Sequence, residues 1–220
     1  MNISVFFNGK AYFGGFPSQK DVELLENLGV KTFVDLTYGH EKGISKYYTK
    51  YEYINYPIRD RSVPNNLWSF AVLILKIEQI LKNNPDNHKI YIHCKGGHGR
   101  SGILVACLLC HIDKIDPIRS IEKTTVYHNK RPIMKEKWKK LGSPQTYKQK
   151  QFVINFFKPI YQQPLNSYYP ENFLYTIKTY PLLCKYLFNS GLRPIIDFNG
   201  FQYTNLTNIR NQLYINMMRG

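Results

Sequence analysis

Apolar and polar positions follow two different periods along the first three quarters of the chain. Runs with period-two alternation or continuous apolar character predict strands at 3–7, 11–15, 31–37, 51–58 and 89–93. Segments of helical periodicity predict helices at 19–28, 67–81, 100–113, 117–128 and 144–157. Asn8-Gly9 predicts a hairpin turn between the first two strands, and Ser18 and Gly29 bound the first helix. The alternation predicts an α/β fold with a mostly parallel central sheet flanked by helices.

The character of the chain changes after Lys158. Residues 159–220 carry five basic and two acidic side chains and are interrupted by five prolines, with frequent tyrosine and asparagine. The sequence therefore predicts a main domain at 1–158 and a C-terminal appendage at 159–220. The appendage is expected to contain helices and a short strand at 193–198, and it holds no chemical motif that would indicate its role.

Composition indicates a packed globular protein, since 43% of the 220 residues are hydrophobic and 15% are aromatic. No apolar run of about 18 residues predicts a membrane span, and the N-terminus lacks the pattern of a signal peptide. Cys107 and Cys110 form a CxxC inside an apolar helical run, which favours buried structural thiols over a redox or zinc site. We expect a soluble protein of the cytoplasm. Frequent Lys, Asn, Ile and Tyr are typical of an AT-rich genome such as that of a large DNA virus, which would place the protein in the host cytoplasm or the virion.

Positive charge is concentrated in one part of the chain. The formal net charge is +15, and between Lys130 and Lys158 nine basic residues face one acid, a local balance of 9 − 1 = +8. Such a block favours an anionic partner. A phosphoprotein, RNA and an anionic membrane all remain open, and the oligomeric state is not indicated.

The strongest chemical pattern is "IYIHCKGGHGRSGILVACLLC", residues 90–110. Gly96, Gly97 and Gly99 lie between a predicted strand and a predicted helix, where backbone N–H groups and the helix dipole can surround an anion. A nucleotide-binding loop would need a Lys-Ser/Thr pair after its last glycine, which is absent. Amide dipoles and the cation of Arg100 would stabilise a thiolate at Cys94. A thiolate in a phosphate-sized bowl opposite a guanidinium points to nucleophilic attack on phosphorus.

The segment "HCKGGHGRSG" resembles the HCx5R-S/T phosphate-binding loop of the protein tyrosine phosphatase superfamily. The resemblance implies a phosphocysteine intermediate on Cys94, phosphoryl binding by Arg100 and a hydrogen bond from Ser101 to the departing thiolate. It also implies that His93 supports the ionised cysteine from behind the loop, and that no metal or cofactor is needed. The implied phosphate-binding residues are the remainder of the loop, Lys95, Gly96, Gly97, His98 and Gly99, together with Arg100.

Phosphoryl transfer to Cys94 also needs an acid to protonate the leaving group. Upstream, "YPIRDRSVP" resembles the general-acid loop of the dual-specificity branch, and Asp60 fits the role of that acid. Asp35 is the only near competitor, and its place within a predicted strand favours burial or local pairing.

Two further segments extend the resemblance to about residues 3–158. "SPQTYKQKQF" resembles the QTxxQxxF segment that positions the hydrolytic water, with Gln145 as the better match and Gln149 one helical turn later. "KRP" at 130–132 resembles the arginine-proline of dual-specificity members. The spacing resembles compact members such as kinase-associated phosphatase.

The substrate class stays open at this point. The short segment before Asp60 lacks room for the phosphotyrosine-binding loop of larger tyrosine-specific enzymes, which favours a dual-specificity protein phosphatase. Lys95 matches the HCKxGKGR loop of phosphoinositide phosphatases, but His98 stands where that loop has its second lysine. An RNA 5′-triphosphatase would suit the basic surface but differs in its loop and needs no acid. A non-catalytic phosphate-binding pseudophosphatase usually loses Cys, Arg or Asp, and this chain retains all three.

Overall fold

The structure, a computed structural model, describes residues 1–83 and 88–162. Its strands are β1 (Ile3–Phe6), β2 (Ala11–Gly14), β3 (Val30–Asp35), β4 (Glu52–Asn55) and β5 (Lys89–His93). Its α-helices are α1 (Gln19–Asn27), α2 (Leu67–Asn83), α3 (Arg100–Ile112), α4 (Pro117–Asn129), α5 (Glu136–Leu141) and α6 (Tyr147–Gln162). The predicted appendage lies outside the described residues except for the end of α6, so its expected helices and strand stay predictions.

One five-stranded sheet forms the centre of the fold, in the order β1-β2-β5-β3-β4. β1 pairs antiparallel with β2 through a tight turn at Phe7–Gly9, and the other three pairings are parallel. The expectation of a mostly parallel sheet is therefore confirmed. β5 lies between β2 and β3, and its register places His93 opposite Gly14 on one side and Asp35 on the other.

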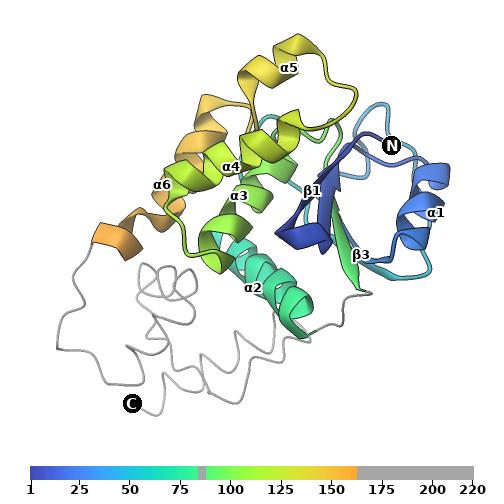
Figure 1. Cartoon of the computed structure of the whole chain (residues 1–220), viewed down its shortest axis with the longest axis horizontal. Helices are drawn as coiled ribbons and strands as arrows, with labels where there is room; N and C mark the ends of the chain where they lie inside the picture. Colours follow the sequence, from blue (N-terminus) through green and yellow to red (C-terminus); the bar gives the residue numbers. More distant parts are fainter. Residues whose placement is uncertain (84–87, 163–220) are drawn as a thin grey trace. The chain divides into compact units, whose positions relative to one another are not determined.

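Helices cover both faces of this sheet (Figure 1). α1 packs near β3 on one face, while α3 and α4 lie together on the other, with α3 against β2 and β5. α1 begins as predicted at Gln19, after the N-cap Ser18, whose side chain accepts a hydrogen bond from the Asp21 backbone N–H in a reciprocal capping box. Every residue of α3 from Arg100 to His111 is buried, including both thiols of the CxxC, which fits their structural interpretation.

Three elements differ clearly from the sequence prediction, one of them α6, which spans Tyr147–Gln162 instead of the predicted 144–157. β4 is shorter than the predicted 51–58 because the chain leaves the sheet after Asn55, and its residues are mostly exposed at the sheet edge. α5 was not predicted, since its six residues EKWKKL are too few and too basic for an apolar period to stand out.

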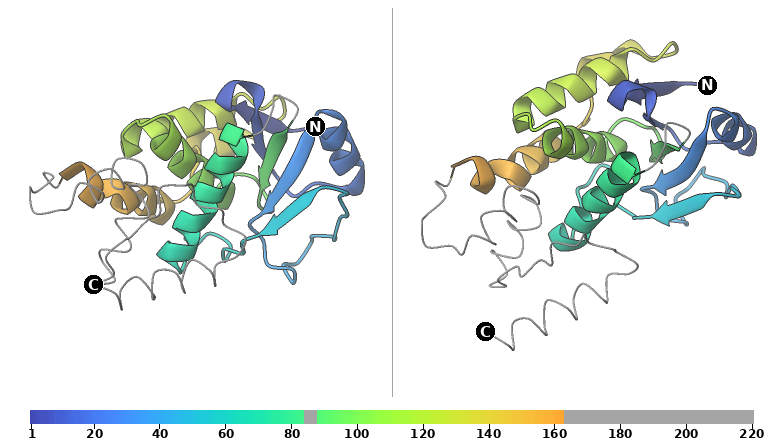
Figure 2. Two further views of the ribbon diagram at one scale, coloured as in Figure 1. Left: turned by 90° about the horizontal axis from the view of Figure 1, so that it is seen from below. Right: turned by 60° about the horizontal axis from the view of Figure 1, so that its bottom comes forward.

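By their contacts the residues divide into two compact units, and α2 and α6 each contribute to both. The two views of Figure 2 show the sheet of the first unit, 1–65 and 78–154, from other sides. In the described ranges, none of the helices combines the length and the apolar character that a bilayer span requires.

Candidate active site

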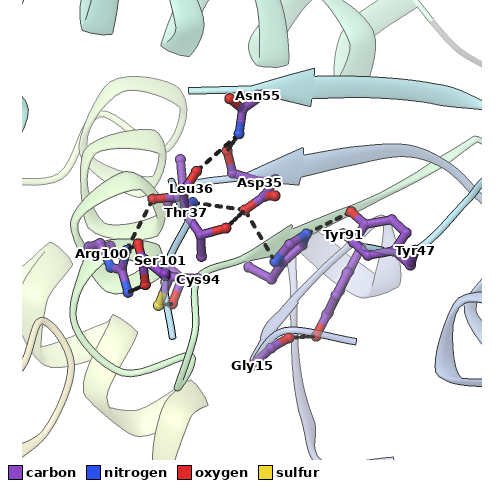
Figure 3. A network of polar contacts seen from close by, with 12 residues as sticks. Gly15, Asp35, Leu36, Thr37, Tyr47, Asn55, Tyr91, Cys94, Arg100 and Ser101 are labelled. Carbon is purple, nitrogen blue, oxygen red and sulfur yellow. Dashed lines mark hydrogen bonds and ion pairs between the residues drawn. The ribbon is translucent and has the colours of Figure 1, made fainter. Parts of the chain in front are cut away.

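Cys94 and Arg100 stand at the two ends of the turn between β5 and α3, as the sequence predicts. Cys94 is only 3% exposed, and its Sγ accepts a hydrogen bond from the backbone N–H of Gly97 at 3.3 Å. Ser101 Oγ lies 3.6 Å from the same sulfur. Figure 3 shows Cys94, Arg100 and Ser101 in one cluster at the start of α3. The turn therefore directs a backbone N–H at the sulfur that the resemblance implies to be the nucleophile.

Gly97 is the position in the loop where a side chain cannot be accommodated. Its φ is +73°, a conformation that favours glycine. A Cβ on Gly97 would also overlap the backbone of Gly14 at the end of β2. The loop is therefore packed directly onto the neighbouring strand, and this packing fixes its curvature.

The Arg100 guanidinium is held by a carboxylate that the sequence analysis missed. Nη1 and Nη2 of Arg100 donate to the two carboxylate oxygens of Glu41, the second at 3.0 Å. Nη1 also donates to the carbonyl of Ile58 at 3.0 Å. Burial would raise the pKa of Glu41, but hydrogen bonds from Arg100 and the Tyr38 backbone outweigh it and lower that pKa below its usual value. The buried cation is thus paired and oriented before any substrate binds.

We expect Glu41→Gln to lower kcat/KM for p-nitrophenyl phosphate by about 10- to 100-fold, because Arg100 would lose the partner that orients it. Glu41→Asp, which keeps the charge, should recover part of the loss. Glu23→Gln, an exposed carboxylate on α1, is the matched control and should leave the rate unchanged. Equal rates for Glu41→Gln and the control would show that Glu41 does not position Arg100.

Asp60 reaches the same guanidinium from the segment after β4. Its Oδ1 lies 3.0 Å from Arg100 Nη2, while 63% of its side chain remains exposed to solvent. A carboxylate that is exposed and lies beside the arginine predicted to bind phosphate has the placement that the predicted general acid requires. Asp35, the competitor, is buried and accepts hydrogen bonds from Thr37 and from the Tyr53 hydroxyl, so it pairs locally as expected.

His93 is completely buried behind the loop. The Tyr47 hydroxyl lies 2.7 Å from its Nε2, and Asp35 Oδ1 lies 3.7 Å from its Nδ1. Figure 3 shows Asp35 and Tyr47 within this polar network. Burial lowers the pKa of His93 to about 4, and Asp35 offsets this only in part, so the imidazole is neutral at physiological pH. Any support that His93 gives to Cys94 therefore comes from its position and dipole rather than from a positive charge.

Arg131 of the "KRP" segment supports the loop from below. It is 3% exposed, donates to the Gly97 carbonyl at 2.8 Å and to Ser4 Oγ at 2.8 Å, and lies over the Phe13 ring. Burial lowers the pKa of Arg131 to about 10, which still leaves it charged at neutral pH. This one side chain joins the loop to β1 and β2.

Comparison with known proteins decides the family. A family model described as "Swiss Army Knife protein, DSP-PTPase phosphatase domain" matches residues 15–153, which includes the loop, Glu41, Asp60 and Arg131. The chain belongs to this DSP-PTPase family. The membership confirms the resemblance found in the sequence.

Relatives and solved structures agree with a DSP-PTPase domain. A protein of Invertebrate iridescent virus 6 that is named as a tyrosine phosphatase is 50% identical over 121 residues, covering 54% of this chain and 46% of the relative. A similarly named protein of Invertebrate iridescent virus 3 is 39% identical over 160 residues, covering 71% and 66%. The match thus spans less than two thirds of either relative. The structure of kinase-associated phosphatase superposes with a TM-score of 0.57 at 21% identity, covering 74% of this chain and 98% of that one, which shows the shared fold.

The glutamine that meets the loop of this DSP-PTPase domain is Gln149 rather than Gln145, which the sequence analysis prefers as the water-positioning residue. A Cβ on Gly99 would lie 2.8 Å from both terminal atoms of the Gln149 side chain. Gln149 is buried and donates to the Ser62 carbonyl at 3.0 Å, in the segment that follows Asp60. Gln145 and Gln149 are the two glutamines of the same motif, four residues apart. The sequence alone does not show which of them packs on Gly99. The water-positioning role predicted for Gln145 stays a prediction.

Lys95 and His98 have different surroundings. Lys95 is exposed, and its Nζ donates to the Lys42 carbonyl at 2.5 Å. The His98 ring stacks on Trp138 with centroids 4.7 Å apart, and its Nδ1 lies 2.8 Å from His128 Nε2. Burial, with the nearby charges of His128 and Arg131, lowers the pKa of His98 to about 4. His98 is therefore a neutral structural part of the loop.

Proposed function

We propose that the protein is a cysteine-dependent phosphatase that dephosphorylates phosphotyrosine, and also phosphoserine and phosphothreonine, in proteins. The observation that carries this proposal is the loop from Cys94 to Arg100. A backbone N–H points at the Cys94 sulfur, and the buried Nε of Arg100 has no hydrogen-bond partner within the described ranges. Buried donors are normally paired. An unpaired guanidinium N–H beside a stabilised thiolate suits a phosphoryl oxygen.

Phosphate binding would use the edge of Arg100 formed by Nε and Nη2, which can grip two oxygens. Nη2 contacts Asp60, so a bound phosphoryl group would take the place of the Asp60 carboxylate at this atom. Glu41 and the Ile58 carbonyl would keep Nη1 in place during the exchange. Asp60 would then stand free at the mouth of the loop, where the leaving group departs.

The proposed reaction has two steps. The Cys94 thiolate attacks phosphorus, the P–S bond forms, and the bond to the leaving oxygen breaks as Asp60 donates its proton to that oxygen. A water molecule then attacks the phosphocysteine, Asp60 accepts its proton, and the P–S bond breaks with its electron pair returning to sulfur. Ser101 Oγ, 3.6 Å from Sγ, is placed to donate a hydrogen bond to the departing thiolate.

A protein substrate is favoured over a phosphoinositide by the state of His98. A phosphoinositide loop with two lysines offers two cations, whereas the ring here is neutral and held by His128 and Trp138. The retained Asp60 argues against an RNA 5′-triphosphatase, which needs no acid. Retention of Cys94, Arg100 and Asp60 together argues against a pseudophosphatase.

A substrate panel tests the proposal. Purified protein should hydrolyse phosphotyrosine and phosphothreonine peptides without added metal, with kcat/KM at least about tenfold above that for phosphoinositides or 5′-triphosphate RNA. Vanadate, a phosphate analogue, should inhibit. A preference for lipid or RNA would overturn the assignment to proteins, and absence of all hydrolysis would favour the phosphate-binding module.

We also propose where the protein acts in the cell and what it binds. Two viral relatives and a cysteine usage without a disulfide scaffold support the cytoplasm, and the host cytoplasm or virion if the chain is viral. The partner is the phosphoprotein substrate. The basic stretch 130–158 would favour substrates with acidic residues near the phosphate.

A further inference from the structure

A second pocket lies directly against the phosphate loop and is lined by none of the residues assigned to the chemistry. It has a volume of about 370 Å³. Gly96 and His98 of the loop form one side, and the other walls include Phe16, Ile133, Met134 and Trp138. The pocket and the predicted phosphate site therefore share Gly96 and His98.

The pocket walls are fixed to the loop and to one another. Trp138 stacks on His98 with an interplanar angle of 19°. The backbone N–H of Phe16 donates to the Lys95 carbonyl at 3.0 Å. Asn2 and Ile133 exchange two hydrogen bonds, of 2.6 and 3.3 Å, which join the first residues to the segment before α5 (Figure 1). The pocket is therefore formed before a ligand arrives, as specificity pockets usually are.

Of the three charged residues that line this pocket, Arg131 and Lys135 are positive and Asp21 is negative. Lys135 lines it and is exposed, and Lys137 lies over the Trp138 ring at 4.5 Å. Asp21 also lines it, but its carboxylate already accepts hydrogen bonds from the Ser18 backbone and hydroxyl. A ligand would meet aromatic and aliphatic side chains with the exposed Lys135 beside them. An apolar group next to a carboxylate is complementary to both features.

We propose that this pocket is a specificity subsite, which binds an apolar side chain of the phosphoprotein substrate that lies close to the phosphorylated residue and next to an acidic one. This inference rests on the proposed function, because it takes the substrate to be a phosphoprotein. Sharing Gly96 and His98 with the phosphate loop places the pocket beside the substrate chain. Lys135 selects the acidic neighbour.

Phosphotyrosine peptides with one leucine moved through the flanking positions test the subsite. Each peptide carries alanine elsewhere and one glutamate beside the leucine, and kcat/KM is measured relative to p-nitrophenyl phosphate, which has no flanking residue. We expect one leucine position to raise the relative kcat/KM by about tenfold over alanine, the typical value of one apolar contact in a pocket.

Paired variants then tie the preference to the pocket. Ile133→Ser should reduce the leucine preference at least about threefold. Ile118→Ser on α4 is the matched control, because Ile118 is also a largely exposed isoleucine, at 58% against 77% for Ile133, and does not line the pocket. Lys135→Glu should remove the preference for the glutamate, whereas Lys148→Glu, with the same change of net charge, should keep it.

The outcomes separate the two proposals. A flat leucine profile, or equal effects of Ile133→Ser and Ile118→Ser, would overturn the subsite while leaving the phosphopeptide activity, and so the proposed function, in place. Hydrolysis of p-nitrophenyl phosphate without hydrolysis of any phosphopeptide would overturn both. A single favoured position that Ile133→Ser weakens and Ile118→Ser preserves would support the subsite.

Discussion

Cys94→Ser is expected to lower kcat for p-nitrophenyl phosphate by at least about 10⁴-fold, since a serine hydroxyl in the same place does not ionise at neutral pH. The loop should keep its shape, because the contact to Cys94 from the Gly97 N–H can equally be made to a hydroxyl oxygen. Phosphopeptide binding, measured by fluorescence anisotropy, should therefore stay within about threefold of the wild type. The variant would bind its substrate without turning it over.

Unchanged thermal unfolding is the control for Cys94→Ser, because the residue is buried and misfolding would also remove activity. Turnover above about one hundredth of the wild-type rate would identify another nucleophile and contradict the phosphocysteine mechanism. Loss of both turnover and phosphopeptide binding, with an intact unfolding transition, would assign Cys94 to binding rather than to chemistry.

Asp60→Asn is expected to lower kcat for a phosphotyrosine peptide by about 10²- to 10⁴-fold. The tyrosine oxygen is a poor leaving group without a proton, whereas p-nitrophenolate departs more easily, so the loss should be smaller with p-nitrophenyl phosphate. The decline in rate toward alkaline pH that a required acid produces should also disappear in the variant. Steady-state kinetics over a pH series, with both substrates, measure these effects.

Asp113→Asn is the control for Asp60→Asn, because Asp113 caps the opposite end of α3 from Arg100 and pairs with Lys123. It should leave both rates unchanged. Equal losses with both substrates for Asp60→Asn would mean that the carboxylate acts on Arg100 rather than on the leaving group. An unchanged rate would revive the RNA 5′-triphosphatase interpretation, which requires no acid.

The chemistry of the site was predictable from sequence to the extent that it is local in the chain. Cys94, the glycines and Arg100 lie within seven consecutive positions whose strand–turn–helix context sets their geometry. Asp60 could be found because the segment around it, after a predicted strand, resembles the general-acid loop of the dual-specificity branch. Glu41 could not be found in this way, because it lies in a charged loop without periodicity, and only the folded chain brings it to Arg100.

The residues that would contact the substrate are less predictable from the sequence, because their roles depend on contacts with distant parts of the chain. His98 stands where a phosphoinositide phosphatase loop has a lysine, and the sequence does not show that its ring is held against α4 and α5 by His128 and Trp138. The choice between Gln145 and Gln149 likewise depends on which face of one helical turn meets Gly99, which a motif of similar spacing does not decide. Side-chain direction is set by tertiary packing, and single-sequence patterns do not contain it.

The phosphate loop is held in place by residues from other parts of the domain. The Gly97 carbonyl accepts a hydrogen bond from Arg131, the His98 carbonyl accepts one from Ser143 Oγ at 2.7 Å, and Arg100 donates to Glu41, so these three supports come from outside residues 90–110. A synthetic peptide of residues 90–110 would contain the nucleophile and the arginine but none of these partners. We expect such a peptide to be an ordinary thiol in solution, because the reactivity belongs to the assembled domain rather than to the motif.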